Sequence, residues 1–112
     1  MVTKRGAKRT TRHVLIVGAG DAGSLAASRM LEGDPDMPGD PIGFADDDPA
    51  KLGQAIAGLT VLGTCDDIPR LCEEYDVGQI VMAVPSANLV VRDRVFGIRM
   101  STGCRVLTLP PI

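Results

Sequence analysis

The chain has 112 residues, 45% of them hydrophobic and 23% charged, which is the balance of an ordinary globular domain. This length holds one domain, because two cores of half the size would each bury too little surface. Phe44, Tyr75 and Phe96 are the only aromatic residues, so the chain lacks the stacking side chains that proteins use to hold single-stranded nucleic acid.

The net charge of −2 conceals an asymmetry between two parts of the sequence. Residues 1–12 form a basic arm with five of the 12 basic residues and no acid, whereas residues 13–112 hold all 14 acids. We expect no nucleic-acid partner, because this acidic body is repelled by a phosphate backbone. The arm allows two interpretations, a flexible solvated leader or a juxtamembrane segment. No apolar run approaches the length of a membrane span or forms a signal peptide.

The three cysteines, Cys65, Cys72 and Cys104, form no CxxC pair, and His13 is the only histidine. This spacing indicates neither a metal site nor a Cys–His nucleophile. We therefore expect free thiols in a reducing compartment, where they serve as small core side chains.

Alternating strand and helix patterns begin at residue 13. His13–Val17 is a β-branched apolar run that ends at a glycine, which is typical of a buried parallel strand. A helix is expected over Ala22–Leu31, with Leu25 and Met30 facing the sheet. The proline- and glycine-rich stretch Gly33–Pro41 then predicts an irregular loop.

The alternation continues to the end of the chain. The expected elements are a strand at Pro41–Ala45, a short helix at Asp48–Leu52, a strand at Gly58–Gly63, a helix at Asp66–Tyr75, a strand at Gln79–Val84, a helix at Asn88–Ser101 and a strand at Arg105–Leu109. This order predicts an α/β fold, a Rossmann-like doubly wound parallel five-stranded sheet in a single domain. The expected strand order is 3-2-1-4-5, with a ligand crevice at the carboxyl ends of the first and fourth strands.

A GxGxxG motif, GAGDAG, lies between the first predicted strand and the first predicted helix. Gly18 permits the tight turn, Gly20 lets the backbone approach a pyrophosphate, and Gly23 lets the helix pack on the strand. The N–H groups at the helix start, where Asp21 and Ala22 lie, attract the anion. The Asp21 carboxylate repels a pyrophosphate unless it points away, and capping of the helix is its alternative role.

An acidic block follows the second predicted strand. Asp46 is expected to bind ribose hydroxyls and Asp47 is a second candidate, whereas Asp48 is expected to cap the following helix. An acid at this position repels a 2′-phosphate, so NAD(H) is favoured over NADP(H). Coenzyme A is a weaker candidate because its 3′-phosphate needs a cation, and only Lys51 is close in sequence. The alternative interpretation is a solvated loop tip.

The loop after the fourth predicted strand also opens onto the crevice. Pro85 and Ser86 are candidate cofactor-binding residues, since Ser86 or Asn88 can donate to a phosphate or a sugar or can merely cap the next helix. No Tyr-x-x-x-Lys pair, Ser/His/Asp set or metal cluster accompanies them. The sequence therefore predicts a binding domain without catalytic residues.

Four segments together carry a family resemblance: HVLIVGAGDAG, PIGFADDDPAKLGQAIAGLTVLGT, IVMAVPSA and RVLTLPPI. They resemble the nucleotide-binding domain of membrane-anchored bacterial polysaccharide-biosynthesis proteins, the capsule-type nucleoside-diphosphate-sugar 4,6-dehydratases and epimerases. The resemblance covers residues 13–112 and extends to polyprenyl-phosphate sugar-1-phosphate transferases and to coenzyme-A-binding-like domains. Gly18, Gly20 and Gly23 match the family's loop, and Asp46 and Asp47 match its acidic block.

The resemblance implies a place in a larger protein. In that family the domain follows membrane helices and precedes a separate catalytic domain, so it lies on the cytoplasmic side of the bacterial inner membrane. The expected partners are therefore a dinucleotide or nucleotide-sugar ligand and the catalytic domain of the same parent chain, with membrane contact only through the parent.

Three hypotheses follow. The first is a non-catalytic regulatory or assembly domain that binds NAD(H), with a nucleotide sugar or coenzyme A as alternative ligands. The second is an NAD-dependent UDP-sugar oxidoreductase domain. The third is a structural homodimerisation module that has a vestigial ligand site and pairs through an exposed strand edge.

Overall fold

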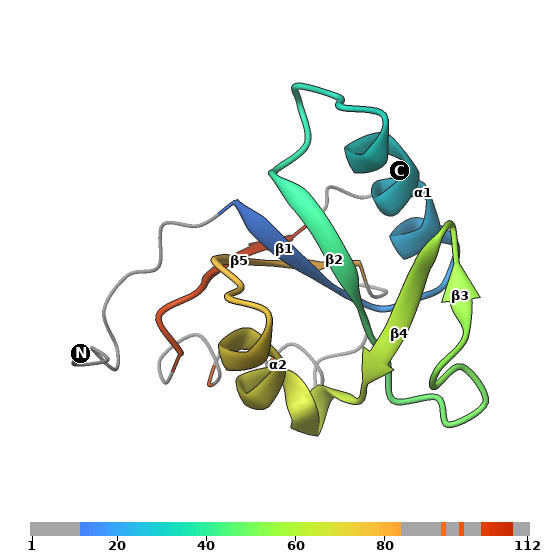
Figure 1. Ribbon diagram of the computed structural model, residues 1–112, viewed down its shortest axis with the longest axis vertical. Helices are drawn as coiled ribbons and strands as arrows, with labels where there is room; N and C mark the ends of the chain where they lie inside the picture. Colours follow the sequence, from blue (N-terminus) through green and yellow to red (C-terminus); the bar gives the residue numbers. More distant parts are fainter. Residues whose placement is uncertain (1–11, 84–92, 94–96, 98–101, 109–112) are drawn as a thin grey trace.

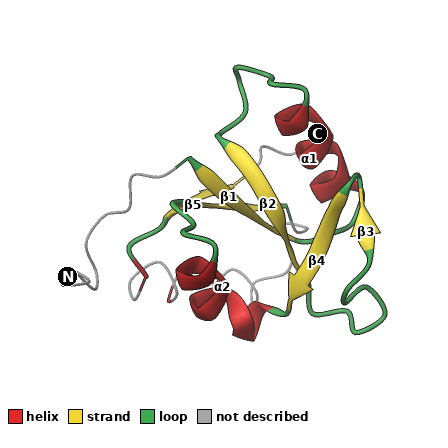
Figure 2. Cartoon of the chain, in the orientation of Figure 1, coloured by secondary structure: helices red, strands yellow, loops and turns green. Residues whose placement is uncertain are grey.

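The described part of the chain alternates between strands and helices, except that strands follow one another directly between residues 40 and 63 (Figure 1 and Figure 2). A computed structural model describes residues 12–83, 93, 97 and 102–108. Its elements, in chain order, are β1 (His13–Val17), α1 (Asp21–Leu31), β2 (Asp40–Ala45), β3 (Ala55–Ile56), β4 (Leu59–Gly63), the 3-10 helix η1 (Cys65–Asp67), α2 (Ile68–Glu74), β5 (Gln79–Met82) and β6 (Arg105–Thr108).

The strands form one sheet in the order β3-β4-β2-β1-β5-β6. Pairing is parallel from β4 through β2, β1 and β5 to β6, and this confirms the predicted Rossmann-like order of five strands. The sixth strand, β3, pairs antiparallel with β4 and was not predicted. Its two-residue turn at Ala57 and Gly58 has positive φ at both positions, 51° and 84°. Such a turn favours Asn-Gly, so an alanine at the first position hides the hairpin from sequence inspection.

The side chains of the central strand β1 alternate between the two faces of the sheet, and those of Val14–Val17 are buried on both faces. Val14 and Ile16 belong to the core cluster under α1, whereas Leu15 and Val17 belong to the cluster under α2. The two helices therefore cover opposite faces of the sheet, as a doubly wound parallel sheet requires.

The buried face of α1 differs from the prediction at one position. Gly23, Ala26, Ala27 and Met30 are its buried residues, at the i, i+3, i+4, i+7 spacing of a single helical stripe. Leu25 lies on the opposite face of the helix and is 45% exposed, so the expectation that it faces the sheet is wrong. Small residues are used at this face because they let α1 approach the sheet closely.

The predicted helix Asp48–Leu52 is also wrong, because this segment forms turns. The Lys51 N–H donates to the Asp48 carbonyl oxygen at 3.0 Å, which starts one turn of chain. Gly53 then adopts φ 79°, and its N–H donates to Val61 of β4 at 2.9 Å. Pairing with the sheet thus begins before a helix can develop.

Several expectations concern residues that the structure does not describe. They are the basic arm up to residue 11, the loop with Pro85 and Ser86, and the helix Asn88–Ser101 apart from positions 93 and 97. The three cysteines are described as thiols, and all are buried in the core cluster under α2. None of the described helices is long and apolar enough to cross a membrane.

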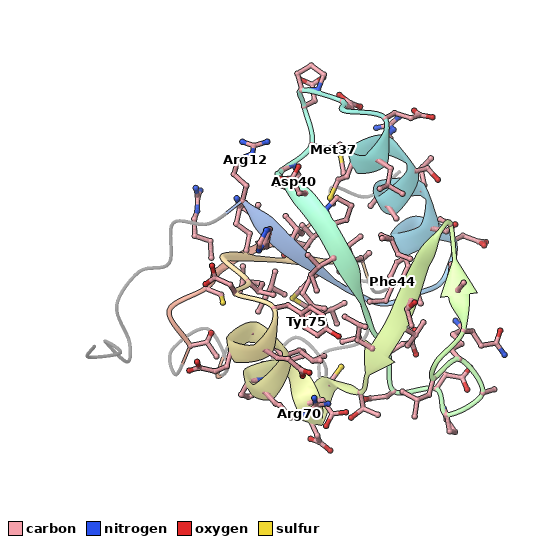
Figure 3. All side chains as sticks on the ribbon, in the orientation of Figure 1. Arg12, Met37, Asp40, Phe44, Arg70 and Tyr75 are labelled. Carbon is pink, nitrogen blue, oxygen red and sulfur yellow. The ribbon has the colours of Figure 1, made fainter. Side chains whose placement is uncertain are left out.

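Among the described residues, Phe44 is the largest fully buried side chain, and it packs under α1 (Figure 3). Replacing it with alanine removes its contacts and leaves a cavity, so Phe44→Ala should lower the free energy of unfolding by about 3–5 kcal/mol. Urea denaturation followed by circular dichroism measures this difference. Leu52→Ala is the matched control, because Leu52 is 54% exposed and should change stability little. Equal stability of the two variants would contradict the assigned core.

Candidate functional site

The glycine-rich loop connects the carboxyl end of β1 to the start of α1. Gly18 has φ 101°, a left-handed conformation that favours glycine, and its N–H donates to the Ala45 carbonyl oxygen at 2.8 Å. This hydrogen bond joins the loop to the end of β2. The loop therefore crosses the carboxyl edge of the sheet where β1 and β2 lie side by side.

The other two glycines of the motif have different structural reasons. A Cβ on Gly23 would overlap the carbonyl oxygen of Gly18, so only glycine lets α1 approach the loop. Among the described residues, a Cβ on Gly20 would meet no atom within 4 Å, and the φ of −88° at this position is open to any residue. Within the part of the chain that the structure describes, neither packing nor backbone conformation requires glycine at position 20. The open space is what a ligand approaching the backbone would use.

The start of α1 provides an anion-binding end. Gly20 is the N-cap residue, and no side chain of the described residues caps the helix. The first-turn N–H groups have no partners inside the helix, and the helix dipole adds a partial positive charge. Asp21 is exposed as the first helical residue and does not cap the helix, while Ala22 is half-buried against the core cluster under α1.

Asp46 connects the acidic block to the glycine loop. Its Oδ2 accepts the Ala19 N–H at 2.8 Å, and its Oδ1 accepts the Asp48 N–H at 2.8 Å. The carboxylate is thereby oriented, with its side chain 16% exposed. Each oxygen keeps a further lone pair, so the group can still accept hydrogen bonds from two ribose hydroxyls.

Lys51 completes the site, and sequence reasoning identified it only as a nearby cation. Its Nζ lies 3.8 Å from Asp46 Oδ2 and 3.5 Å from the Ala19 carbonyl oxygen. The turn that replaces the predicted short helix brings the lysine back to the loop. The signal in the sequence was the Asp-Pro turn with a lysine two residues after the proline, but the direction of the side chain depends on that turn.

The other acidic residues that the sequence offered as candidates do not join Asp46 at the glycine loop. Asp47 turns away from the loop and accepts the Cys65 N–H at 2.9 Å, which ties the end of β2 to η1. Asp48 accepts the Ala50 N–H at 3.0 Å and so caps a turn instead of a helix. Pro85 and Ser86 lie outside the described residues. The structure thus brings together the glycine loop, the start of α1, Asp46 and Lys51.

The described residues bring no reactive groups together at this site. The described residues contain no cluster of three or more metal-ligating side chains. His13 Nδ1 lies 3.0 Å from the Tyr75 carbonyl oxygen, at the opposite end of β1 from the glycine loop. Among the described residues the site therefore offers a helix dipole, oriented hydrogen-bonding groups and one ion pair, which suit binding.

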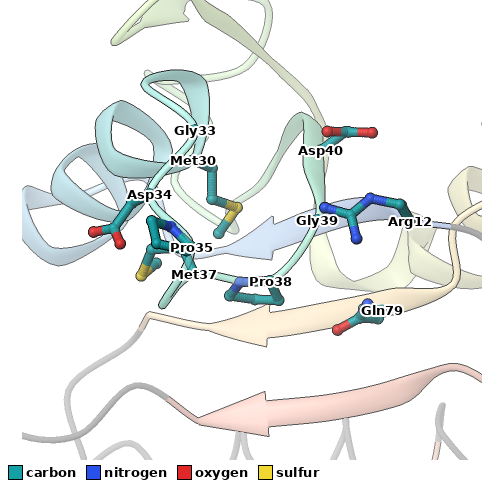
Figure 4. A pocket seen from close by; sticks show the side chains of 10 residues that line it. All are labelled: Arg12, Met30, Gly33, Asp34, Pro35, Met37, Pro38, Gly39, Asp40 and Gln79. Atoms are coloured by element: carbon teal, nitrogen blue, oxygen red, sulfur yellow. The ribbon is translucent and has the colours of Figure 1, made fainter.

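A second hollow of about 270 Å³ lies at the amino ends of β2 and β5 (Figure 4). Asp34, Asp40, Arg12 and Gln79 are among its lining residues, together with the carboxyl end of α1. Two carboxylates, only partly balanced by Arg12, and the negative end of the helix dipole disfavour a diphosphate there. The glycine loop, at the other edge of the sheet, is the better anion site.

Comparison with known families agrees with this geometry. A family model described as a CoA-binding domain matches residues 1–98. The chain belongs to this family. The resemblance stated from the sequence motifs is confirmed by two curated relatives. The chain is 30% identical over 99 residues to the probable polysaccharide biosynthesis protein EpsC of Bacillus subtilis, and 33% identical over 78 residues to the capsular polysaccharide biosynthesis protein CapD of Staphylococcus aureus.

These matches cover 88% and 69% of the chain but only 16% and 13% of the relatives, so the CoA-binding domain corresponds to a small part of each. Among solved structures, UDP-D-quinovosamine 4-dehydrogenase from Vibrio fischeri has a TM-score of 0.73 at 30% identity, over 92% of this chain and 81% of that one. The Rex-family repressor RSP in complex with β-NADH has a TM-score of 0.63 at 16% identity, over 89% and 54%, and shares the fold.

The contrasting roles of two glycines give a direct test of this site. Gly23→Ala should destabilise the domain by about 1–3 kcal/mol or prevent folding, because the new methyl group overlaps the Gly18 carbonyl oxygen. Gly20→Ala should lower the melting temperature much less, because the space beside it is open among the described residues and only the N-cap preference for glycine over alanine is lost. Thermal unfolding measures both. A larger loss of stability at position 20 than at position 23 would contradict the described loop.

Proposed function

We propose that this domain binds NAD(H) as a non-catalytic regulatory or assembly module of a polysaccharide-biosynthesis enzyme. The observation that carries the proposal is the open space at Gly20, in front of the uncapped start of α1 and beside the oriented Asp46 carboxylate. A pyrophosphate fits against the helix start, and the adenosine ribose then lies against Asp46.

The comparisons support the setting of this proposal. The curated relatives are named polysaccharide biosynthesis proteins, and the nucleotide-sugar enzyme from Vibrio fischeri shares the fold over most of both chains. The NADH complex of RSP shows that a similar fold accommodates this dinucleotide. In the proposed arrangement the parent enzyme is a nucleoside-diphosphate-sugar dehydratase or epimerase at the cytoplasmic face of the bacterial inner membrane, and its own catalytic domain performs the chemistry.

Calorimetric titration of the full chain with NAD+, NADH, NADP+, coenzyme A and UDP-N-acetylglucosamine tests the ligand. We expect NAD(H) to bind, and a hundredfold excess over the dissociation constant to stabilise the fold by about 2.7 kcal/mol. Gly20→Val should abolish binding, because its side chain fills the open space while the domain stays folded. Asp46→Ala should weaken binding through the lost ribose contacts.

The matched control is Asp36→Ala, since Asp36 is an exposed acid in the loop after α1, at the opposite edge of the sheet. It should leave binding unchanged. If the folded wild-type chain binds none of these ligands, that result would contradict the proposal and favour a structural dimerisation module.

A second candidate function is a UDP-sugar oxidoreductase. The observation in its favour is the 30% identity to a named 4-dehydrogenase over 81% of that chain. Against it stands the site itself, where the described residues place no acid–base pair beside the glycine loop. We expect no reduction of NAD+ when the chain is mixed with UDP-sugars and NADH absorbance is followed. Turnover that Gly20→Val abolishes would establish the oxidoreductase instead.

A further inference from the structure

Lys51 places a cation beside the proposed ribose position, although an unphosphorylated ribose needs no cation for binding. Its backbone is held by turns on both sides, because its N–H donates to Asp48 and its carbonyl oxygen accepts from Gln54, each at 3.0 Å. From this anchored backbone the side chain returns to the glycine loop, where Nζ lies 3.5 Å from the Ala19 carbonyl oxygen. The ammonium group is therefore placed at the loop by the fold.

The charge balance at the end of β2 depends on this residue. Asp46 faces the proposed ribose position, and a carboxylate there repels a phosphate carried by that ribose. Lys51 Nζ lies 3.8 Å from Asp46 Oδ2, and within the described ranges no other lysine or arginine forms an ion pair with Asp46. The net charge of the Asp46–Lys51 ion pair is close to zero, so a phosphate on the ribose meets less electrostatic repulsion at this position than it would from Asp46 alone.

The ammonium group also has hydrogen-bonding capacity to spare. It carries three donors, of which one is directed at Ala19 and one faces Asp46. The Lys51 side chain is 34% exposed, so the third donor reaches solvent. A phosphate on the ribose would accept from this donor, while an unphosphorylated ribose would bond to Asp46 alone.

We propose that Lys51 is a specificity-determining residue that lets this acidic site bind adenosine diphosphates whose ribose carries a phosphate. The inference rests on the proposed nucleotide site at the glycine loop and extends its ligand class. The 3′-phosphate of coenzyme A and the 2′-phosphate of NADP share the relevant chemistry. The acid accepts the remaining ribose hydroxyl, and the lysine donates to the phosphate.

Two matched ligand pairs isolate the ribose phosphate: coenzyme A against dephospho-coenzyme A, and NADP+ against NAD+. Calorimetry on the full wild-type chain should find that the phosphorylated member of at least one pair binds as tightly as its partner. Lys51→Gln should weaken that member roughly tenfold and leave the unphosphorylated member within about twofold. Lys51→Arg should retain the wild-type ratio, because the cation is kept.

Arg29→Gln is the charge-matched control, since Arg29 is an exposed cation in the last turn of α1, at the opposite end of that helix from the loop. It should leave all four affinities unchanged. The pair that responds to Lys51→Gln identifies whether the 3′- or the 2′-phosphate is the group recognised. Thermal unfolding confirms that each variant is folded before its affinities are compared.

Three results would overturn the inference. They are an equal loss of both members of each pair in Lys51→Gln, an unchanged ratio in that variant, and a wild-type chain that binds only unphosphorylated ligands. In each of these cases the nucleotide site itself stands. If the wild-type chain binds none of the four ligands, that result would instead count against both the proposed function and the role of Lys51.

Discussion

The missing side chain at Gly23 determines where α1 lies, because a Cβ there would overlap the Gly18 carbonyl oxygen. With glycine, the start of the helix sits directly against the loop that leaves β1. The loop is joined in turn to the end of β2 through the Gly18 N–H and the Ala45 carbonyl oxygen. One close contact between helix and loop thus places a helix dipole, two strand ends and an open space together.

Asp46 serves the fold and the proposed site through the same carboxylate. By accepting N–H groups from Ala19 and Asp48, it holds the loop and the following turn in place without any ligand. A ribose would then meet an acceptor that is already oriented, so less conformational freedom is lost on binding. Lys51 balances the charge of this group. Without the lysine, the carboxylate would repel a ligand whose ribose carries a phosphate.

The two edges of the sheet differ in their electrostatics because one helix contributes opposite ends to them. The amino end of α1 faces the glycine loop, and its carboxyl end faces the hollow lined by Asp34 and Asp40 (Figure 4). A concave shape alone therefore does not locate the anion site. The deciding features are the direction of the helix and the residues at its start.

By itself, the sequence determined most of the strands and the loop chemistry, because apolar patterns and the GxGxxG spacing act over short stretches of chain. The order of the five parallel strands then followed, because strands that alternate with helices and use right-handed crossovers leave few topologies. Local pattern also placed Asp46 at the end of β2. Only the tertiary structure decided that Asp47 turns to Cys65, 18 residues away, and that Lys51 reaches Ala19, 32 residues away. Tertiary packing also leaves the Leu25 side chain exposed to solvent, because α1 packs against the sheet mainly through small residues. These features depend on contacts between distant segments, and local propensity carries no information about such contacts.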